Sequence, residues 1–247
     1  MEQDIGNRLL KFADDTKLFG VVSSGKEVDG LREDLRKLCD WSAEWLMMFN
    51  TDKCKVMHFG KSNSLSVYSM NGANLSVINE EKDLGIIVQD TLKVSAQCAK
   101  VVKSANKVLG MIKRTFVSRE PDIIVNLYKA FVRPHLEYCI QAWRPHLKKD
   151  IDLLEGVQRR ATKLINGFSD ITYQQRLAKL KLTTLETRRL REDTIEVYKI
   201  LKGFDNVEYK DLFQLSTTNL RGHGYKLFKA RVNTDIGKYS FCNRVIE

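Results

Sequence analysis

The spacing of apolar residues changes near residue 92, and this change limits which folds the chain can adopt. Before it, apolar residues recur at helical spacing from Val28 to near Phe49, and this helical stretch lies among shorter segments typical of strands, at 54–59 and 84–90. After it, apolar residues recur only with the helical period of about 3.6 residues. We therefore predict an α+β fold, in which a mixed sheet-and-helix part is followed by helices alone.

Aromatic residues and prolines refine the expected helices. Trp41, Trp45 and Trp143 lie at helical spacing, and we interpret them as core residues. Pro121 suits the first turn of a helix, where its missing N–H costs little. A helix that begins at Pro121 is expected to stop before Pro134, because proline removes an interior hydrogen bond.

The segment at 9–20 places two adjacent carboxylates, Asp14 and Asp15, between apolar flanks. This pattern predicts a hairpin of two short, buried strands with its turn at 14–16. Adjacent carboxylates repel each other unless solvent or a cation offsets their charge, and oxygen ligands bind hard divalent cations well. The pair is therefore either a solvated acidic turn or part of a divalent metal site.

The chain is basic as a whole. Its 41 Lys and Arg residues exceed its 31 Asp and Glu residues, for a formal net charge of +10. This excess favours a polyanionic partner, nucleic acid first and an anionic membrane surface second. The charge alone is also compatible with a merely soluble basic protein.

Two further features predict an intracellular protein without a membrane span. The N-terminus carries acidic residues and has no long apolar core, so it does not resemble a signal peptide, and the longest apolar runs are too short to cross a bilayer. The five cysteines form no C-x-x-C pair, and their odd number favours reduced thiols.

The helix expected at 93–116 has an uncompensated charge. From Lys93 to Arg119 the chain contains seven basic residues and no acidic one. At about 100° per residue, four of them fall on one narrow stripe, opposite an apolar face that runs from Val101 to Phe116. This basic stripe consists of Lys100, Lys103, Lys107 and Arg114. It predicts binding to a phosphate backbone, with an ordinary solvated face as the alternative.

Five segments, taken in order, resemble the reverse transcriptases of non-LTR retrotransposons, and among them the chicken-repeat and jockey-like elements. "FADDTKL" is similar to the Asp-Asp hairpin of the polymerase palm, and "NTDKCKVMHFG" to the motif after it. "EKDLGIIVQD" resembles the primer-grip hairpin. Two longer helical segments resemble the thumb and the region beyond it. The five segments span 12–18, 50–60, 81–90, 127–165 and 185–203.

The resemblance implies a two-metal polymerase site that uses Mg²⁺. Asp14 would be the principal metal ligand, and Asp15 would assist or shape the turn. Lys53 would neutralise or protonate the pyrophosphate. Leu84 and Gly85 would present backbone to the primer terminus. The basic stripe would follow the backbone of an RNA template paired with a DNA primer.

The resemblance also implies the organisation of the chain. Residues 1–91 correspond to part of the palm, 92–166 to a helical thumb, and 167–247 to a C-terminal helical region with a basic tail. The family's site needs a further aspartate well upstream, yet only thirteen residues precede Asp14. We therefore expect the chain alone to lack polymerase activity. The alternatives are a non-catalytic nucleic-acid-binding protein derived from a retroelement, and a decayed fragment without a role.

Overall fold

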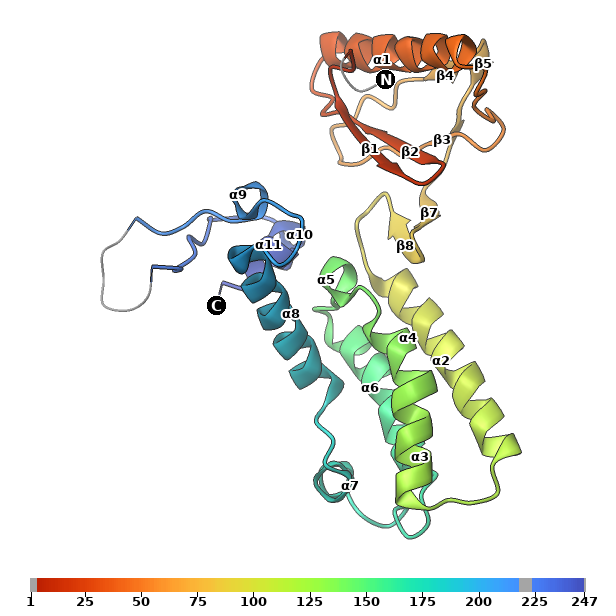
Figure 1. Cartoon of the computed structure of the whole chain (residues 1–247), viewed down its shortest axis with the longest axis vertical. Helices are drawn as coiled ribbons and strands as arrows, with labels where there is room; N and C mark the ends of the chain where they lie inside the picture. Colours follow the sequence, from red (N-terminus) through yellow and green to blue (C-terminus); the bar gives the residue numbers. More distant parts are fainter. Residues whose placement is uncertain (1–3, 218–223, 247) are drawn as a thin grey trace. The chain divides into compact units, whose positions relative to one another are not determined.

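The chain folds into two compact units, Met1–Leu92 and Lys93–Glu247. The structure, shown in Figure 1, is a computed structural model and describes residues 4–217 and 224–246. The strands β1–β8 all lie in the first unit, whereas long helices make up most of the second. This arrangement is compatible with the predicted α+β class. Each unit is described by itself below.

Over its described residues, 4–92, the first unit consists of one long helix and four small two-stranded sheets. The pairs β1–β2, β4–β5 and β7–β8 are antiparallel, and β3–β6 is parallel. The strands are β1 (Arg8–Phe12), β2 (Asp15–Phe19), β3 (Lys55–Val56), β4 (Ser69–Met70), β5 (Ala73–Asn74), β6 (Ser76–Val77), β7 (Glu80–Asp83) and β8 (Ile86–Gln89), and the helix is α1 (Gly25–Glu44).

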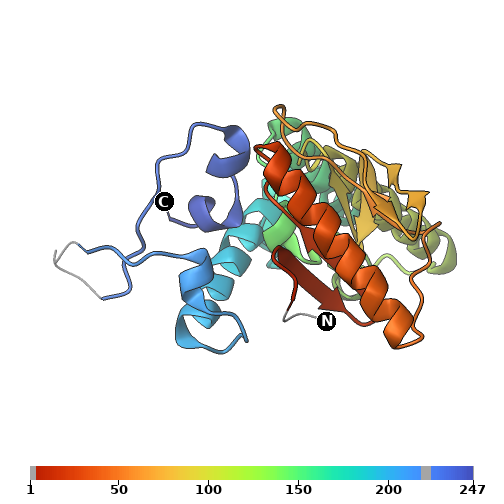
Figure 2. The ribbon, with the colours of Figure 1, turned by 90° about the horizontal axis from the view of Figure 1, so that it is seen from above.

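Helix α1 begins at a capping box. The carboxylate of Glu27 accepts hydrogen bonds from the backbone N–H and the hydroxyl of Ser24, so the first turn is well satisfied. The helix ends at Glu44, earlier than the prediction near Phe49, because Leu46 adopts a positive φ of 55°. Figures 1 and 2 show the helix next to the β1–β2 hairpin.

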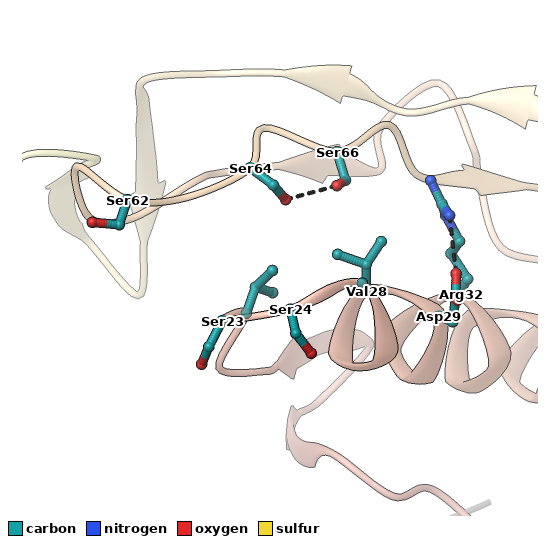
Figure 3. A pocket seen from close by; sticks show the side chains of 10 residues that line it. Ser23, Ser24, Val28, Asp29, Arg32, Ser62, Ser64 and Ser66 are labelled. Carbon is teal, nitrogen blue, oxygen red and sulfur yellow. Dashed lines mark hydrogen bonds and ion pairs between the residues drawn. The ribbon is translucent and has the colours of Figure 1, made fainter.

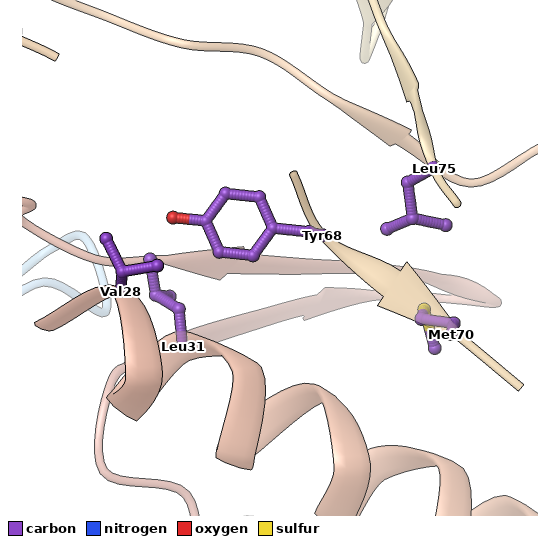
Figure 4. Close-up of a cluster of buried hydrophobic side chains, with 5 residues drawn as sticks. All are labelled: Val28, Leu31, Tyr68, Met70 and Leu75. Atoms are coloured by element: carbon purple, nitrogen blue, oxygen red, sulfur yellow. The ribbon is translucent and has the colours of Figure 1, made fainter. Parts of the chain in front are cut away.

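The core of the first unit is small and forms between α1 and the strands that follow it. Figure 4 shows its five buried side chains, with two from α1 meeting three from the segment around β4. Leu18 of β2 packs against this cluster and so attaches the hairpin to the core. The cluster consists of Val28, Leu31, Tyr68, Met70 and Leu75.

The second unit is built from helices. Its long helices α2, α6 and α8 are joined by shorter ones, and α2 packs against α6 and α4. The helices are α2 (Ser95–Thr115), α3 (Pro121–Leu127), the π-helix η1 (Tyr128–Val132), α4 (Arg133–Glu137), α5 (Ile140–Trp143), α6 (Lys148–Lys163), α7 (Tyr173–Leu180), α8 (Leu185–Lys202), α9 (Tyr209–Leu212), α10 (Asp235–Lys238) and α11 (Phe241–Arg244).

The helix that begins at Pro121 does not stop before Pro134, contrary to the prediction. It continues as η1 and then α4, which includes Pro134. In a π-helix each N–H bonds to a carbonyl five residues back, so the register shifts by one residue just before the proline. The shifted register accommodates a residue that cannot donate a hydrogen bond.

A buried polar network fixes α6 within the second unit. The side chain of Gln158 accepts a hydrogen bond from Tyr128 at 2.7 Å and donates to Tyr173 at 2.8 Å and to the carbonyl of Thr183 at 3.0 Å. The carboxylate of Glu155 accepts from the backbone N–H of Leu185 at 3.0 Å. These bonds join α6 to η1, α7 and α8, and so they determine which face of α6 meets solvent.

Other expectations concern the tail and the membrane. The predicted basic tail at 219–231 falls partly on 218–223, which are outside the described residues. On either side of that gap, Leu215 and Leu227 form an antiparallel bridge. Across residues 4–217 and 224–246, no helix is both long and apolar enough to span a membrane.

Candidate functional site

The Asp14–Asp15 pair lies at the tip of the β1–β2 hairpin. The register pairs Phe12 with Asp15, so the two-residue turn is Ala13–Asp14. Ala13 has a φ of 52°, and a positive φ at the first central residue is typical of a type II′ turn. The prediction of a turn at 14–16 is therefore wrong by one residue, since Asp15 is the first residue of β2.

The apolar flanks of the hairpin are not buried as predicted. Leu10 is 44% exposed and Phe12 is 61% exposed. The reason is the size of the sheet, because within the described residues no third strand pairs with β1 or β2. Residues paired across the two strands point to the same face of the hairpin, and Leu9 is paired with Leu18, which packs against the core. Leu10 and Phe12 alternate with Leu9 and therefore point to the other face, away from the core.

Asp14 and Asp15 are both exposed. Carboxylates are suitable oxygen ligands for Mg²⁺, and adjacent positions at a hairpin tip allow both to approach one cation. The chain supplies only these two here, since the described part contains no group of three or more His, Cys, Asp or Glu side chains that could hold a metal. The pair therefore fits as part of a metal site and does not complete one.

A buried carboxylate on α1 fixes the start of the hairpin. Asp34 accepts hydrogen bonds from the backbone N–H groups of Gly6 and Asn7 at 3.0 and 2.9 Å, and from the Asn7 side chain at 2.8 Å. Burial acts to raise the pKa of Asp34, but these bonds and nearby Lys37 outweigh it and hold the pKa below its usual value. Asp34 is thus an ionised anchor for β1, which sequence patterning did not identify.

A second hairpin, β7–β8, has Leu84 and Gly85 as its two turn residues. Both have positive φ, 44° and 91°, which is the backbone of a type I′ turn. A hairpin is what the resemblance implies for this segment. Leucine rarely adopts this conformation, so the turn is locally strained.

Two ion pairs attach β7 to the neighbouring strands. Lys17 of β2 pairs with Asp83, which directly precedes the Leu84–Gly85 turn. Lys55 of β3 pairs with Glu81 at 2.7 Å. Both contacts join elements that are distant in sequence. The structure therefore brings together the two hairpins that carry Asp15 and Leu84.

Lys53 occupies a tight turn before β3. Its backbone N–H donates to the carbonyl of Asn50 at 3.0 Å, and its side chain is exposed. Among the described residues, no hydrogen bond or ion pair joins Lys53 to Asp14 or Asp15. The structure thus gives Lys53 an accessible position and does not bring it into contact with the acidic pair.

The basic stripe lies on α2, opposite its buried face. Val101, Ala105 and Ile112 are buried as predicted, whereas Phe116 lies beyond the helix end and is exposed. Leu109 occupies the buried face instead. The stripe residues differ in exposure, since Lys100 is half-buried and the other three are exposed. The three exposed residues are Lys103, Lys107 and Arg114. They form no ion pair with any described residue.

A pocket that the sequence did not suggest lies beside the N-terminus of α1. Figure 3 shows it between that helix end and the segment 62–66, with a volume of about 290 Å³. Its polar groups are largely paired: Ser64 bonds to Ser66 at 2.8 Å, and Arg32 pairs with Asp29 at 3.1 Å. Because the guanidinium is already neutralised, the pocket offers no surplus charge to a ligand.

Comparison with known proteins gives two matches to curated sequences. The RNA-directed DNA polymerase from mobile element jockey of Drosophila melanogaster is 24% identical over 174 residues, which cover 67% of this chain and 18% of that protein. The polymerase of the same name from Drosophila funebris is 25% identical over 143 residues, covering 56% of this chain and 16% of that protein. The chain spans less than a fifth of the length of either relative.

Two other comparisons give no match. No family model matches the chain, and no solved structure is similar to it. The family assignment therefore depends on the two polymerases, which agree with the resemblance carried by the five motifs. Over more than half of its length, this chain is a relative of the reverse transcriptases of jockey-like non-LTR elements.

Proposed function

We propose that the chain is the palm-and-thumb portion of an RNA-directed DNA polymerase. The observation that carries this proposal is the similarity to the jockey polymerases over 174 residues. In the proposal, 1–91 correspond to part of the palm, 92–166 to the thumb and 167–247 to the C-terminal region. RNA template, DNA primer and Mg²⁺ are the proposed partners of the intact enzyme.

In this proposal the hairpin tip supplies part of the ligand set that a metal-dependent nucleotidyl transfer needs. Asp14, in the exposed turn, is the proposed principal ligand, and Asp15 assists it from the first position of β2. When bound at such a site, Mg²⁺ stabilises the charge that develops on the transferred phosphate. The described part of this chain offers two carboxylates at this place. We therefore propose that the remaining metal ligands come from a segment that the longer relatives contain outside the matched region.

The other proposed site residues act on the substrates. Lys53 is exposed and cationic, and we propose that it neutralises or protonates the pyrophosphate. Leu84 and Gly85 form the turn that we propose contacts the primer terminus. The Lys17–Asp83 ion pair holds this turn beside the acidic hairpin. Lys100, Lys103, Lys107 and Arg114 of α2 are assigned to the template–primer backbone.

A chimaera tests the polymerase proposal. The segment of the Drosophila melanogaster jockey polymerase that precedes the matched region is joined to this chain, and RNA-templated primer extension is measured. Asp14→Asn should abolish synthesis, whereas Lys53→Ala should slow it by about 10²–10⁴-fold, as expected for a general acid. Asp170→Asn, at an exposed position of the second unit, serves as the control and should leave the rate unchanged. Equal and mild losses at Asp14 and Lys53 would contradict the assignment.

A second candidate function is nucleic-acid binding without catalysis. The observation that favours it is a contrast within the described residues. Lys103, Lys107 and Arg114 of the stripe are exposed and form no ion pair there, whereas the candidate metal-ligand set consists of two carboxylates. The chain alone should then bind a primer–template duplex and show no primer extension with Mg²⁺. Templated synthesis by the chain alone that disappears in Asp14→Asn would exclude this candidate.

A further inference from the structure

The first unit contains two of the chain's five cysteines. Cys39 lies on α1, and Cys54 directly precedes β3, whereas the other three cysteines belong to the second unit. Both cysteines of the first unit are free thiols, and both are half-buried. Within this unit, each thiol can therefore form a disulfide only with the other.

Both cysteines pack against the same hydrophobic cluster, the five buried side chains of Figure 4. Cys39 lies one turn after Leu35 on α1, and Leu35 also packs against this cluster. Cys54 and Val56 alternate with Lys55 along the chain, and both contact the cluster. Burial raises the pKa of the Cys54 thiol, and the thiol of Cys39 raises it further. The fold therefore brings two thiols, fifteen positions apart in sequence, onto the surface of one small core.

Cys54 also closes the tight turn that carries Lys53. The backbone N–H of Cys54 donates to the carbonyls of Asn50 and Thr51 at 3.2 and 3.1 Å. The N–H of Lys53 donates to the carbonyl of Asn50 at 3.0 Å. Because these bonds connect Cys54 to the whole turn, a covalent bond at its sulfur would tether the turn to α1.

We propose that Cys39 and Cys54 are a thiol modification site, at which a peroxide forms a reversible disulfide that fixes the Lys53 turn against α1. One thiolate attacks the O–O bond of hydrogen peroxide, which gives a sulfenic acid and, with the thiol proton, one water. The second thiol then attacks the sulfenic sulfur, the S–S bond forms, and a second water leaves. The two sulfurs lose two electrons in total, and the peroxide gains them. A dithiol reductant reverses the change by thiol–disulfide exchange.

Burial determines how readily the pair reacts. The thiolate is the form that attacks a peroxide, and the raised pKa of Cys54 keeps its thiolate scarce at neutral pH. The pair should therefore need an excess of peroxide. Cys98 of the second unit is an internal reference, because it is completely buried and burial raises its pKa to about 12. It should remain a thiol under conditions that link Cys39 to Cys54.

Peptide mapping of the full wild-type chain tests the disulfide. The chain is treated with hydrogen peroxide, its remaining thiols are alkylated, and its peptides are identified by mass spectrometry. A linked Cys39–Cys54 peptide should appear, and dithiothreitol should remove it. Cys139→Ser, at an exposed cysteine of the second unit, is the control and should leave the linked peptide unchanged. Sulfenic or sulfinic acid without the linked peptide would overturn the proposal, as would linkage of Cys39 to the second unit.

Hydrogen exchange tests the tether without any assay of polymerase activity. The amides of Lys53 and Cys54 donate within the turn, so both should exchange more slowly in the oxidised chain. Dithiothreitol should restore the faster exchange. Exchange rates that are equal in the oxidised and reduced chains would overturn the tether.

The jockey chimaera tests the consequence for Lys53, and this part rests on the proposed function. Peroxide should slow primer extension by about 10–100-fold, because a small displacement of a reacting group is costly, and dithiothreitol should restore the rate. Cys39→Ser should protect the rate, whereas Cys139→Ser should not. Equal slowing in Cys39→Ser would overturn the effect on Lys53. A chimaera that is inactive in both redox states would instead mean that the proposed function has failed, since the linked peptide is measured in the chain alone.

Discussion

An ion pair between Lys17 and Asp83 joins the two hairpins that carry candidate polymerase residues. Lys17 lies two residues after Asp15 on β2, so the two side chains point to the same face of the hairpin. Asp83 immediately precedes the Leu84–Gly85 turn. The pair therefore sets the position of the turn assigned to the primer relative to the carboxylates assigned to the metal.

We expect the Lys17–Asp83 pair to contribute modestly to stability and more strongly to activity. The two side chains are 29% and 35% exposed, so solvent screens part of their attraction. A double-mutant cycle with Lys17→Ala and Asp83→Ala, followed by urea unfolding, should give a coupling of about 0.2–1 kcal/mol. In the jockey chimaera each single substitution should slow primer extension, because a displacement of about 1 Å at a reacting group can cost about 100-fold in rate.

The Arg36–Asp40 pair on α1 is the matched control for this prediction. Arg36 Nη1 lies 2.6 Å from Asp40 Oδ2, but this pair joins two residues of the same helix. A cycle at this pair should give a similar coupling free energy without any change in primer extension. If substitutions at Lys17 and at Arg36 affected the rate equally, the positioning role of Lys17 would be refuted.

Asp34→Asn should loosen the hairpin in a pH-dependent way. In the folded chain its pKa lies below the ordinary value of 3.8, so the ionised form stabilises the fold. That contribution is fully present above the unfolded pKa and is lost as the pH falls through the lower, folded pKa. At pH 7 the substitution should cost about 1.5–3 kcal/mol, the range for hydrogen bonds to a charged group. Unfolding free energies from pH 3 to pH 7 should show the variant and wild type converging at the acidic end.

Hydrogen exchange provides a separate check on Asp34. The amides of Gly6 and Asn7 donate directly to its carboxylate, so both should exchange faster in the variant at pH 7. Asp29→Asn is the control, because Asp29 is exposed on the same helix and pairs with Arg32. Slow exchange at Gly6 in Asp34→Asn would contradict the anchoring role.

Leu84→Asn should stabilise the β7–β8 hairpin. Leu84 has a φ of 44° in a two-residue turn followed by Gly85, and Asn-Gly is the preferred sequence for type I′ turns. Relief of the left-handed strain should raise the free energy of opening by about 0.5–1 kcal/mol, measured by hydrogen exchange across 80–89. The same substitution at Leu153, an exposed helical position, should destabilise instead, because asparagine is a weaker helix former.

The periodic parts of the chain could be predicted from sequence, and the irregular parts could not. The long helices and the buried positions Val101, Ala105 and Ile112 follow from the 3.6-residue period, since that period determines which residues share a face. The basic stripe follows from the same geometry. In contrast, the π-helix before Pro134 depends on a local change of register that no apolar pattern encodes.

The errors at the candidate site have a common physical cause. Burial depends on which elements cover a residue, and this is not a local property of sequence. Trp45 fits the helical spacing of a core residue, yet it lies just beyond the end of α1 and is 62% exposed. Phe12 lies in strand β1, but within the described residues that strand pairs with β2 and with no third strand. Asp34 accepts hydrogen bonds from Gly6 and Asn7, which lie 28 and 27 positions earlier in the sequence. Only the folded chain shows these contacts.

The stripe on α2 should determine how steeply binding depends on salt. Lys103, Lys107 and Arg114 are exposed and uncompensated, so each contact with a phosphate releases condensed counterions. The triple alanine variant should flatten the log–log slope for a primer–template duplex by roughly 0.9 per lost contact. Sequence preference should hardly change, because phosphate contacts position a duplex without identifying its bases.

The folding of the triple variant provides its internal control. Substitutions at exposed positions away from caps and cores alter stability by about 0.5 kcal/mol or less, so urea unfolding should remain close to wild type. A flattened slope with unchanged unfolding then reports lost phosphate contacts and not a damaged helix. Conversely, an unchanged slope in a folded triple variant would make the stripe an ordinary solvated face. Nucleic-acid binding would then have to reside elsewhere on the chain, and its similarity to the jockey polymerases would be the remaining support for it.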